Sequence, residues 1–298
     1  MKSYLLRSLL FVPSNNKKLL TSAVNSDADL LIPDLEDSVY KDVDKQAGRN
    51  LILQMLEKNE FKEKLVFPRI NDRESGNLLK DVYQLADKGI HGFVYPKAKK
   101  AEDIYFIDKL LDTIEFEKKI EKGTFKLIPL IETTSAVLEA KKISKASKRV
   151  IAIAFGAEDF VADLESGGSD DYNESFFVPR SIIAMAARSA SIIPIDTVHI
   201  KVHDLEDLKK NLVISKKLGF EGMLILHPKE IELAHEYYSP NIKEIEYARK
   251  VIDLSDKAAK KGISVTIMEN KFIGPPFVKK AKKILQKYEL IKLIKNKI

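Results

Sequence analysis

The sequence predicts an α/β protein whose main domain is a closed (β/α)8 barrel, a TIM barrel, followed by a C-terminal helical extension. Two features lead to this prediction. Short apolar runs rich in β-forming residues recur eight times, with amphipathic segments between them, and this alternation is typical of a parallel barrel. Most of the runs are continuously apolar, as expected for strands buried on both faces. An open doubly wound sheet is the alternative, although no glycine-rich phosphate-binding motif follows the first run.

The elements of the barrel can be assigned in order along the chain. We expect the eight strands at residues 8–12, 29–33, 64–70, 91–95, 126–131, 149–155, 197–202 and 222–226. We expect the helices at residues 17–25, 42–58, 77–88, 102–119, 135–146, 179–191, 205–218 and 229–238. The barrel domain is therefore predicted to span residues 1–238.

The remaining residues, 239–298, form the predicted extension. Their pattern predicts helices at 241–261 and 276–295, with a short strand at 264–268 between them. A segment of this size is too small to bury a comfortable core of its own. We therefore expect it to pack on the barrel or on a neighbouring subunit.

The composition is that of a globular protein and argues against several other classes. Hydrophobic residues make up 45% of the chain and charged residues 32%, and no apolar run approaches the roughly 20 residues of a membrane helix. We expect no secretory signal, because Arg7 and Pro13 interrupt the first apolar stretch. The absence of cysteine excludes disulfides and suits the cytoplasm. The net charge of +6 is interleaved with acidic residues, which favours an anionic small molecule over nucleic acid as a partner.

Polar residues follow nearly every predicted strand, where a TIM barrel places its chemistry. Glu132 follows the fifth predicted strand and Asp159 follows the sixth, so their side chains can converge above adjacent strands. Two carboxylates with water or substrate oxygens are a typical Mg²⁺ site, whereas the lack of cysteine and the scarcity of histidine argue against Zn²⁺. We therefore expect Mg²⁺ at Glu132 and Asp159. Each acid alone could instead be a helix cap or a first-turn acid.

A second acidic cluster, formed by Asp34, Glu36 and Asp37, follows the second predicted strand. Three carboxylates within four residues repel one another unless cations lie close. The candidate cations are Arg7, Arg69 and Lys97. If the cluster faces the pocket, Glu36 and Asp37 act in catalysis, by transferring a proton or by orienting the cations that bind substrate. A purely structural charge network is the alternative.

Arg69 follows Pro68 at the end of the third predicted strand. Its planar guanidinium can grip a substrate carboxylate with two hydrogen bonds, or it can pair with Glu36 or Asp37, and both roles can hold together. His227, at the end of the eighth predicted strand, is a second-rank candidate for a general base.

These residues belong to longer motifs. They include RSLLFVP at 7–13, DLEDSV at 34–39, PRIN at 68–71, IET at 131–133 and FGAEDF at 155–160. Further matching pieces lie at 96–97, 163–164, 195–196, 219–222, 227–228 and 239–240. In this order, over nearly the whole chain, the motifs resemble the citrate lyase beta subunit family and its relatives, the malyl-CoA and citramalyl-CoA lyases and the HpcH/HpaI aldolases.

The resemblance implies a barrel that assembles as a homotrimer or homohexamer, with Mg²⁺ bound by Glu132 and Asp159 and an oxo-acid held by Arg69. Lys97 is a further candidate for binding the substrate or cofactor. It places a coenzyme A or acyl-carrier site on the segment after the first strand, Ser14, Asn15, Asn16, Lys17 and Lys18. The implied reaction is cleavage of a carbon–carbon bond in a 3-hydroxy-acyl thioester, which releases an oxo-acid and an acyl thioester. Partner subunits of a lyase complex are compatible with it.

The tail departs from the family pattern. Family sequences carry an aspartate there that moves a proton to or from the thioester enolate, and Gly274 stands at its position. Two alternatives therefore stay open, an aldolase that acts on free oxo-acids and a non-catalytic relative that binds an acyl-CoA or an oxo-acid.

Overall fold

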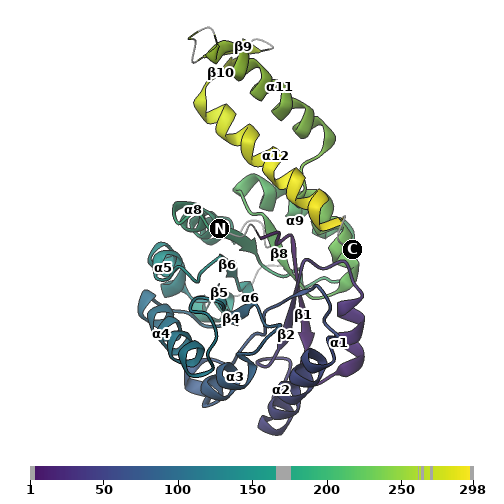
Figure 1. The fold of residues 1–298 in the computed structure, drawn as a ribbon, viewed down its shortest axis with the longest axis vertical. Coiled ribbons are helices and arrows are strands. Elements are labelled where there is room, and N and C mark those ends of the chain that lie inside the picture. The colour runs from purple at the N-terminus through teal and green to yellow at the C-terminus, as the bar shows by residue number, and fades with distance from the viewer. Residues whose placement is uncertain (1–3, 166–175, 261, 263–264, 269–270, 296–298) are drawn as a thin grey trace. The chain divides into compact units, whose positions relative to one another are not determined.

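The computed structural model describes residues 4–165, 176–260, 262, 265–268 and 271–295 (Figure 1). The chain divides into two units, and each is described by itself. The larger runs from Leu6 to His235, and the smaller is built mainly from Glu236 onward. No helix in the described part of the chain is both long enough and apolar enough to cross a membrane.

The larger unit contains a sheet of eight parallel strands. In chain order these are β1 (Ser8–Pro13), β2 (Leu30–Asp34), β3 (Leu65–Val66), β4 (Gly92–Tyr95), β5 (Lys126–Ile131), β6 (Ala152–Phe155), β7 (Ile193–Asp196) and β8 (Gly222–Ile225). Their order in the sheet is β3-β2-β1-β8-β7-β6-β5-β4. This arrangement confirms the predicted α/β barrel, because only the two edge strands, β3 and β4, remain to be joined.

Residues just after β3 join those two edges. The Val94 N–H donates to the Pro68 carbonyl at 3.0 Å, and the Ile70 N–H donates to the Val94 carbonyl at 3.2 Å. Arg69 itself forms parallel bridges to Asp34 on one side and to Val94 on the other. The backbone of Arg69 therefore lies where the barrel closes.

Helices surround the strands (Figure 1). They are α1 (Lys17–Val24), α2 (Asp42–Glu57), α3 (Leu78–Leu85), α4 (Ala101–Glu117), α5 (Thr134–Lys145), α6 (Ala157–Leu164), α8 (Phe177–Ser189), α9 (Leu205–Leu218) and α10 (Ile231–Tyr238), with short 3₁₀ helices at Arg73–Ser75 and Pro228–Glu230. Side-chain caps fix several starting points, since Asn16, Thr133 and Asp204 accept hydrogen bonds from backbone N–H groups of α1, α5 and α9. Apolar strand residues fill the core, and Leu9, Leu30, Ile32 and Phe93 are fully buried.

The smaller unit pairs two helices with a short hairpin. Helices α11 (Ile242–Ala259) and α12 (Pro275–Lys295) flank the antiparallel strands β9 (Thr266–Met268) and β10 (Lys271–Ile273). A small core that includes Val251, Met268 and Ile273 holds them together. Strand β10 was not expected from the sequence.

The seventh strand was predicted in the wrong place. We expected residues 197–202, but β7 is Ile193–Asp196. Pro194 counts against a strand because it has no N–H to donate to a sheet. Here the Pro194 carbonyl still accepts from the Glu221 N–H at 3.0 Å, and the preceding Ile193 N–H donates to the Ile151 carbonyl at 3.0 Å. Pro194 therefore costs the sheet one hydrogen-bond donor and does not prevent the strand from pairing. Helix α6 was also not expected.

Candidate active site

Arg69 is the centre of a buried ion-pair cluster at the ends of β2 and β3. Its Nε and Nη2 atoms donate to the two carboxylate oxygens of Asp34 at 2.6 and 2.7 Å. Its Nη1 atom contacts Asp37 at 2.8 Å and Glu36 at 3.0 Å. Burial lowers the pKa of Arg69, but the three carboxylates outweigh it and raise that pKa above the ordinary value. Arg69 is therefore a fixed cation, already paired with protein acids.

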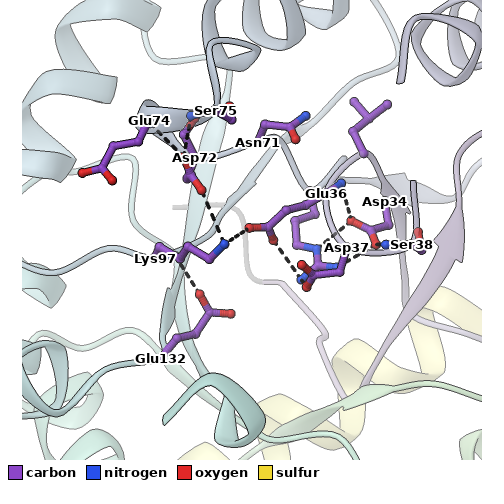
Figure 2. A network of polar contacts seen from close by, with 12 residues as sticks. Asp34, Glu36, Asp37, Ser38, Asn71, Asp72, Glu74, Ser75, Lys97 and Glu132 are labelled. Atoms are coloured by element: carbon purple, nitrogen blue, oxygen red, sulfur yellow. Dashed lines mark hydrogen bonds and ion pairs between the residues drawn. The ribbon is translucent and has the colours of Figure 1, made fainter. Parts of the chain in front are cut away.

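The loop after β2 is folded tightly around Asp34. The Asp34 carboxylate also accepts the N–H groups of Glu36 and Ser38, both at 3.0 Å (Figure 2). Burial raises the pKa of Asp34, but its contacts with Arg69 hold that pKa below the usual range. From outside the loop, the ammonium of Lys45 donates to the Leu35 carbonyl at 3.0 Å. These contacts keep the carboxylates of the loop together.

Lys45 continues into a second buried network that the sequence did not suggest. Its ammonium also donates to the Asn71 side chain, and the Asn71 amide groups donate to Asp81 at 2.6 and 2.8 Å. Asp81 in turn pairs with Arg49. Lys45 and Arg49 stand four residues apart in α2, so the only available signal was a pair of cations on one helix face.

Lys97 connects the Arg69 cluster to Glu132. Figure 2 shows its ammonium between Glu36 and Asp72, at 2.9 and 3.4 Å from their carboxylates. Burial lowers the pKa of Lys97, but Glu36 and the nearby acids raise it above its ordinary value. The Lys97 backbone N–H donates to Oε2 of Glu132 at 2.7 Å. The backbone here is left-handed, with φ of 51°, which a side-chain-bearing residue rarely adopts.

Glu132 and Asp159 stand at the ends of the adjacent strands β5 and β6. Glu132 is 3% exposed, and burial raises its pKa to about 8, with the charges of Glu36 and Asp159 adding to the effect. Asp159, in the first turn of α6, is exposed, and partial burial and the charge of Asp37 raise its pKa. No cation of the described residues pairs with either carboxylate.

The alternative roles for these two acids can now be compared with the structure. Thr133, rather than Glu132, caps α5, by accepting the Ala136 N–H at 3.1 Å. Asp159 does lie in the first turn of α6, where the helix dipole favours an acid. That position satisfies the helix without supplying the carboxylate with a cation.

The predicted carrier segment is split between a buried and an exposed part. Ser14 is fully buried, and its hydroxyl lies so close to Gly48 that a Cβ there would be 2.2 Å from it. Asn15, Lys17 and Lys18 are exposed, and Lys17 pairs with Glu60 at 3.3 Å. Ser14 therefore lies against Gly48 of α2, and the exposed residues of the segment are the ones placed to meet a ligand.

Two other sequence candidates are engaged elsewhere. Arg7 forms an ion pair with Asp29 at 2.7 Å, so Arg69 and Lys97 are the two of the three candidate cations that pair with the acidic cluster. His227 accepts the Lys229 N–H through Nδ1 at 3.2 Å and caps the short helix that follows β8. His227 therefore has a structural role, as the cap of this short helix.

The donor set decides which metal the site could hold. Among the described residues, no group of three or more His, Asp or Glu side chains is arranged to bind a metal ion. A cation at Glu132 and Asp159 would thus have two carboxylate ligands, with water or substrate oxygens for the rest, which suits Mg²⁺. The buried, cation-free Glu132 fits such an ion, because a divalent charge would offset the cost of burying the carboxylate.

Curated relatives of this chain are lyases. Citrate lyase subunit beta of Haemophilus influenzae is 33% identical over 281 residues, which cover 94% of this chain and 96% of the relative. The L-malyl-CoA/beta-methylmalyl-CoA lyase of Rhodobacter capsulatus is 27% identical over 306 residues, which cover 96% of each protein.

Solved structures share the fold. Protein CitE from Mycobacterium tuberculosis, in complex with magnesium, acetoacetate and coenzyme A, matches with a TM-score of 0.73 at 24% identity, over 94% of this chain and 97% of that chain. A citrate lyase from Burkholderia xenovorans matches with a TM-score of 0.84 at 17% identity, over 97% and 93%. The HpcH/HpaI aldolase/citrate lyase family matches residues 7–228. The chain therefore belongs to the HpcH/HpaI aldolase/citrate lyase family, and it is a lyase.

Proposed function

We propose that this chain is a Mg²⁺-dependent carbon–carbon lyase. Its substrate would be a 3-hydroxy-acyl thioester of coenzyme A or of an acyl carrier, of the citryl, malyl or citramalyl type, and its products an oxo-acid and an acyl thioester. The observation that carries the proposal is the contrast between two neighbouring groups at the barrel mouth. Glu132 and Asp159 have no described cation partner, whereas Arg69 and Lys97 supply fixed positive charge beside them.

Glu132 and Asp159 would hold the metal ion. Both offer oxygen ligands, and the chain has no cysteine to form a thiolate site. When bound there, Mg²⁺ polarises the substrate oxygens and lowers the pKa of the hydroxyl that must lose its proton. The magnesium named in the M. tuberculosis structure supports this assignment by family likeness.

Arg69 would bind the carboxylate that becomes part of the oxo-acid. It can do so only if one protein acid gives way, because Asp34 and Glu36 are buried against it. Asp37 is the acid that can move, since its side chain is 61% exposed. We infer that the substrate carboxylate replaces Asp37 on Nη1, while Asp34 keeps the guanidinium in its plane.

Asp37, once released, would act as the base. It takes the proton of the 3-hydroxyl group, the carbon–carbon bond breaks, and its electron pair forms the thioester enolate. The hydroxyl carbon becomes the carbonyl of the oxo-acid, and a proton returned to the enolate completes the acyl thioester. Arg69 and the Lys97 ammonium stabilise the negative charge that develops next to them, and Glu36 holds Lys97 in place at 2.9 Å.

The exposed residues after β1 would meet the thioester's carrier. Lys17 and Lys18 could pair with the phosphates of coenzyme A or with an acidic carrier, and Asn15 lies beside them in the same exposed segment. The malyl-CoA lyase relative and the coenzyme A named in the M. tuberculosis structure support a coenzyme A thioester.

A direct assay tests the proposal. Purified protein is incubated with Mg²⁺ and citryl-CoA, malyl-CoA or citramalyl-CoA, and release of oxaloacetate, glyoxylate or pyruvate is measured. We expect one thioester to be cleaved, with loss of activity on chelation and in Glu132→Gln. No release from any of the three, by a folded protein that binds Mg²⁺, would overturn the thioester lyase assignment.

Gly274 favours a second candidate, an aldolase on free oxo-acids or a non-catalytic binder. It cannot exchange a proton with the enolate, and general acid–base groups contribute about 100- to 10,000-fold. An acid can be introduced, because the atoms nearest to a Cβ at Gly274 belong to the ring of Phe272, at 2.9 Å, and Phe272 is 62% exposed. Gly274→Asp should raise thioester turnover, and Gly274→Asn is the matched control. If Asp and Asn variants behave alike, position 274 has no proton-transfer role.

We also propose a homotrimer or homohexamer, with the residues from Asn241 onward packing on a neighbouring subunit. The smaller unit presents Ile267 and Phe272, which are 72% and 62% exposed, and clusters of this kind mark contact surfaces. Light scattering at micromolar concentration tests the assembly, and a strict monomer would contradict it. Partner subunits of a lyase complex are the remaining proposal, supported by the citrate lyase relatives.

A further inference from the structure

Glu132 is confined by its neighbours on two sides. On one side its Oε2 accepts the Lys97 N–H at 2.7 Å. On the other side lies Gly156, where a Cβ would be 2.4 Å from Cγ and 2.8 Å from Oε1 of Glu132. Real Cβ atoms do not approach other atoms so closely, so a side chain at position 156 and the present place of Glu132 exclude each other.

The backbone of Gly156 does not need glycine for its own conformation. Its φ of −101° and ψ of 91° are extended values that other residues adopt readily. It is also held in place, because its N–H donates to the Ile131 carbonyl at 3.0 Å. An added methyl group could not move away with the backbone, so it would push Glu132 instead. The requirement for glycine here is the volume that Glu132 occupies.

Asp163 ties helix α6 to the segment that carries Glu132. Its Oδ2 atom accepts both the N–H and the hydroxyl of Thr134, at 2.7 and 2.6 Å. Thr134 is the first residue of α5 and stands two positions after Glu132. An acid is favoured at the start of a helix, where N–H groups lack partners within the helix.

The same face of α6 carries Asp159. Residues four positions apart lie on one side of a helix, so Asp159 and Asp163 share the side that faces the start of α5. The contact of Asp163 therefore fastens the face of α6 that carries Asp159 to the segment that carries Glu132. Asp163 is exposed, and the core does not depend on it.

We propose that Gly156 and Asp163 are positioning residues for the Mg²⁺ site: Gly156 leaves room for Glu132, and Asp163 fixes α6, and so Asp159, against the Glu132 segment. Neither residue touches the ion. The inference rests on the proposed function, because it concerns how the two proposed ligands are held. Residues that orient metal ligands typically change metal affinity by roughly 10- to 100-fold when they are altered.

The first test uses Gly156→Ala. Calorimetric titration of the full-length protein with Mg²⁺ alone should show affinity reduced by roughly 10- to 100-fold, with thermal unfolding of the metal-free protein followed in parallel. The decisive comparison is the same substitution in Glu132→Asp protein, where the side chain at 132 is shorter by one methylene. If Gly156→Ala acts through Glu132, it should reduce Mg²⁺ affinity by a much smaller factor in that protein than in the wild type. Losses that simply add would show general loosening and overturn this half of the proposal.

The second test uses Asp163 and does not depend on tolerating a buried methyl group. Asp163→Ala should reduce Mg²⁺ affinity. Asp163→Asn keeps an acceptor for Thr134 but loses the charge, so it distinguishes the effect of the hydrogen bonds to Thr134 from the effect of the negative charge. Asp253→Ala is a matched control, because it removes an exposed acid of the other unit whose ion-pair partner among the described residues is Lys257, at 2.7 Å. We expect wild-type affinity in the control and a larger loss in Asp163→Ala than in Asp163→Asn.

The outcomes separate this inference from the proposed function. A wild-type protein that binds no Mg²⁺ would overturn the metal site and this inference with it. Wild-type binding, with unchanged affinity in both Gly156→Ala and Asp163→Ala, would overturn this inference alone. Equal losses in Asp163→Ala and Asp253→Ala would mean that net charge, and not position, governs the affinity, and would also overturn the role of Asp163.

Discussion

Two sets of carboxylates stand at the same end of the barrel in opposite electrostatic surroundings. Asp34, Glu36 and Asp37 share the guanidinium of Arg69. Glu132 and Asp159 have no cation partner among the described residues, and Glu132 receives only a backbone N–H, at 2.7 Å. The protein therefore pairs the carboxylates of the first set with a cation of its own and leaves those of the second set without a counter-charge from the described residues.

The pKa values show what this difference means. In the first set, Arg69 overcomes the effect of burial and lowers the pKa of Asp34. In the second, burial raises the pKa of Glu132 to about 8. Glu36 is intermediate, because burial outweighs Arg69 and raises its pKa. A cation from outside the chain would offset the negative charge of the second set, whereas Arg69 and Lys97 already offset that of the first. This difference is the physical ground for assigning the metal ion to the second set and the substrate carboxylate to the cations of the first.

Removing the shared cation should break the first set and give the largest effect. Arg69→Ala would leave Asp34 and Glu36 buried, 2% and 7% exposed, without their main counter-charge. Loss of one partner of a buried ion pair costs about 3–5 kcal/mol, so the free energy of unfolding should fall by that amount in denaturant titrations. The control is Asp37→Asn, where the lost partner is 61% exposed and the cost should stay below about 1 kcal/mol. Similar losses in both variants would show that the cluster is not a buried network.

The second set should respond in the opposite way, by losing metal rather than stability. Glu132→Gln and Asp159→Asn remove a proposed ligand charge but leave no cation unpaired. Mg²⁺ affinity should therefore fall beyond the roughly 10- to 100-fold that supporting residues cause, with no loss of stability in the unfolding of the metal-free protein. Calorimetric titration checks the first part and thermal unfolding the second. Retained Mg²⁺ affinity in both variants would end the assignment of this set to metal.

Glu230 extends the comparison to an acid that is enclosed completely. It is fully buried after β8, its Oε2 accepts the Leu226 N–H at 3.2 Å, and its Oε1 lies 4.0 Å from Nδ1 of His199. Burial raises the pKa of Glu230 to about 7. Protonated Glu230 is thus favoured in the folded state, so its contribution to stability is present below about pH 4.5 and lost as the pH rises through about 7.

The neutral variant Glu230→Gln tests this directly. It should match the wild type below about pH 4.5 and be more stable above about pH 7, by roughly 1–3 kcal/mol, given that one pKa unit corresponds to about 1.4 kcal/mol. Unfolding in denaturant at pH 5 and pH 8.5 measures the change. A stability difference that does not vary with pH would mean that the pKa of Glu230 is the same in the folded and unfolded states.

Much of the barrel could be predicted because its strands are continuous apolar runs. The seventh strand was misplaced, because the expected run at 197–202 follows directly on β7, Ile193–Asp196, which pairs with a strand on each side. The ends of the strands could be predicted for the same reason, since parallel strands bring their carboxyl ends to one side. This rule gave Glu132 and Asp159 from the sequence.

Other parts of the site depend on contacts between distant segments, which a sequence pattern does not contain. Arg7 precedes β1, at the opposite end of the parallel strands from Asp34, and pairs with Asp29 just before β2. Lys45 resembles any helix lysine, yet it donates to a loop carbonyl at 3.0 Å. The need for glycine at position 156 comes from the volume of Glu132 and not from a turn signal.

Lys97 belongs to both sets, and separating its two roles should give the smallest effect. Its ammonium serves the first set, through Glu36 at 2.9 Å, with a side chain that is 38% exposed. Its N–H serves the second set, from a left-handed backbone with φ of 51°. Lys97→Ala loses the ion pair, worth up to about 1 kcal/mol at such exposure, and keeps the strained backbone.

Lys97→Gly loses the same ion pair but relieves the left-handed strain, which costs a side-chain-bearing residue about 1 kcal/mol. The glycine variant should therefore be more stable than the alanine variant by about 1 kcal/mol and close to the wild type in denaturant titrations. Both variants keep the N–H to Glu132 and lose a nearby positive charge, so both should bind Mg²⁺ at least as tightly as the wild type. Weaker Mg²⁺ binding in the glycine variant would show that the Lys97 side chain, rather than its backbone, holds Glu132.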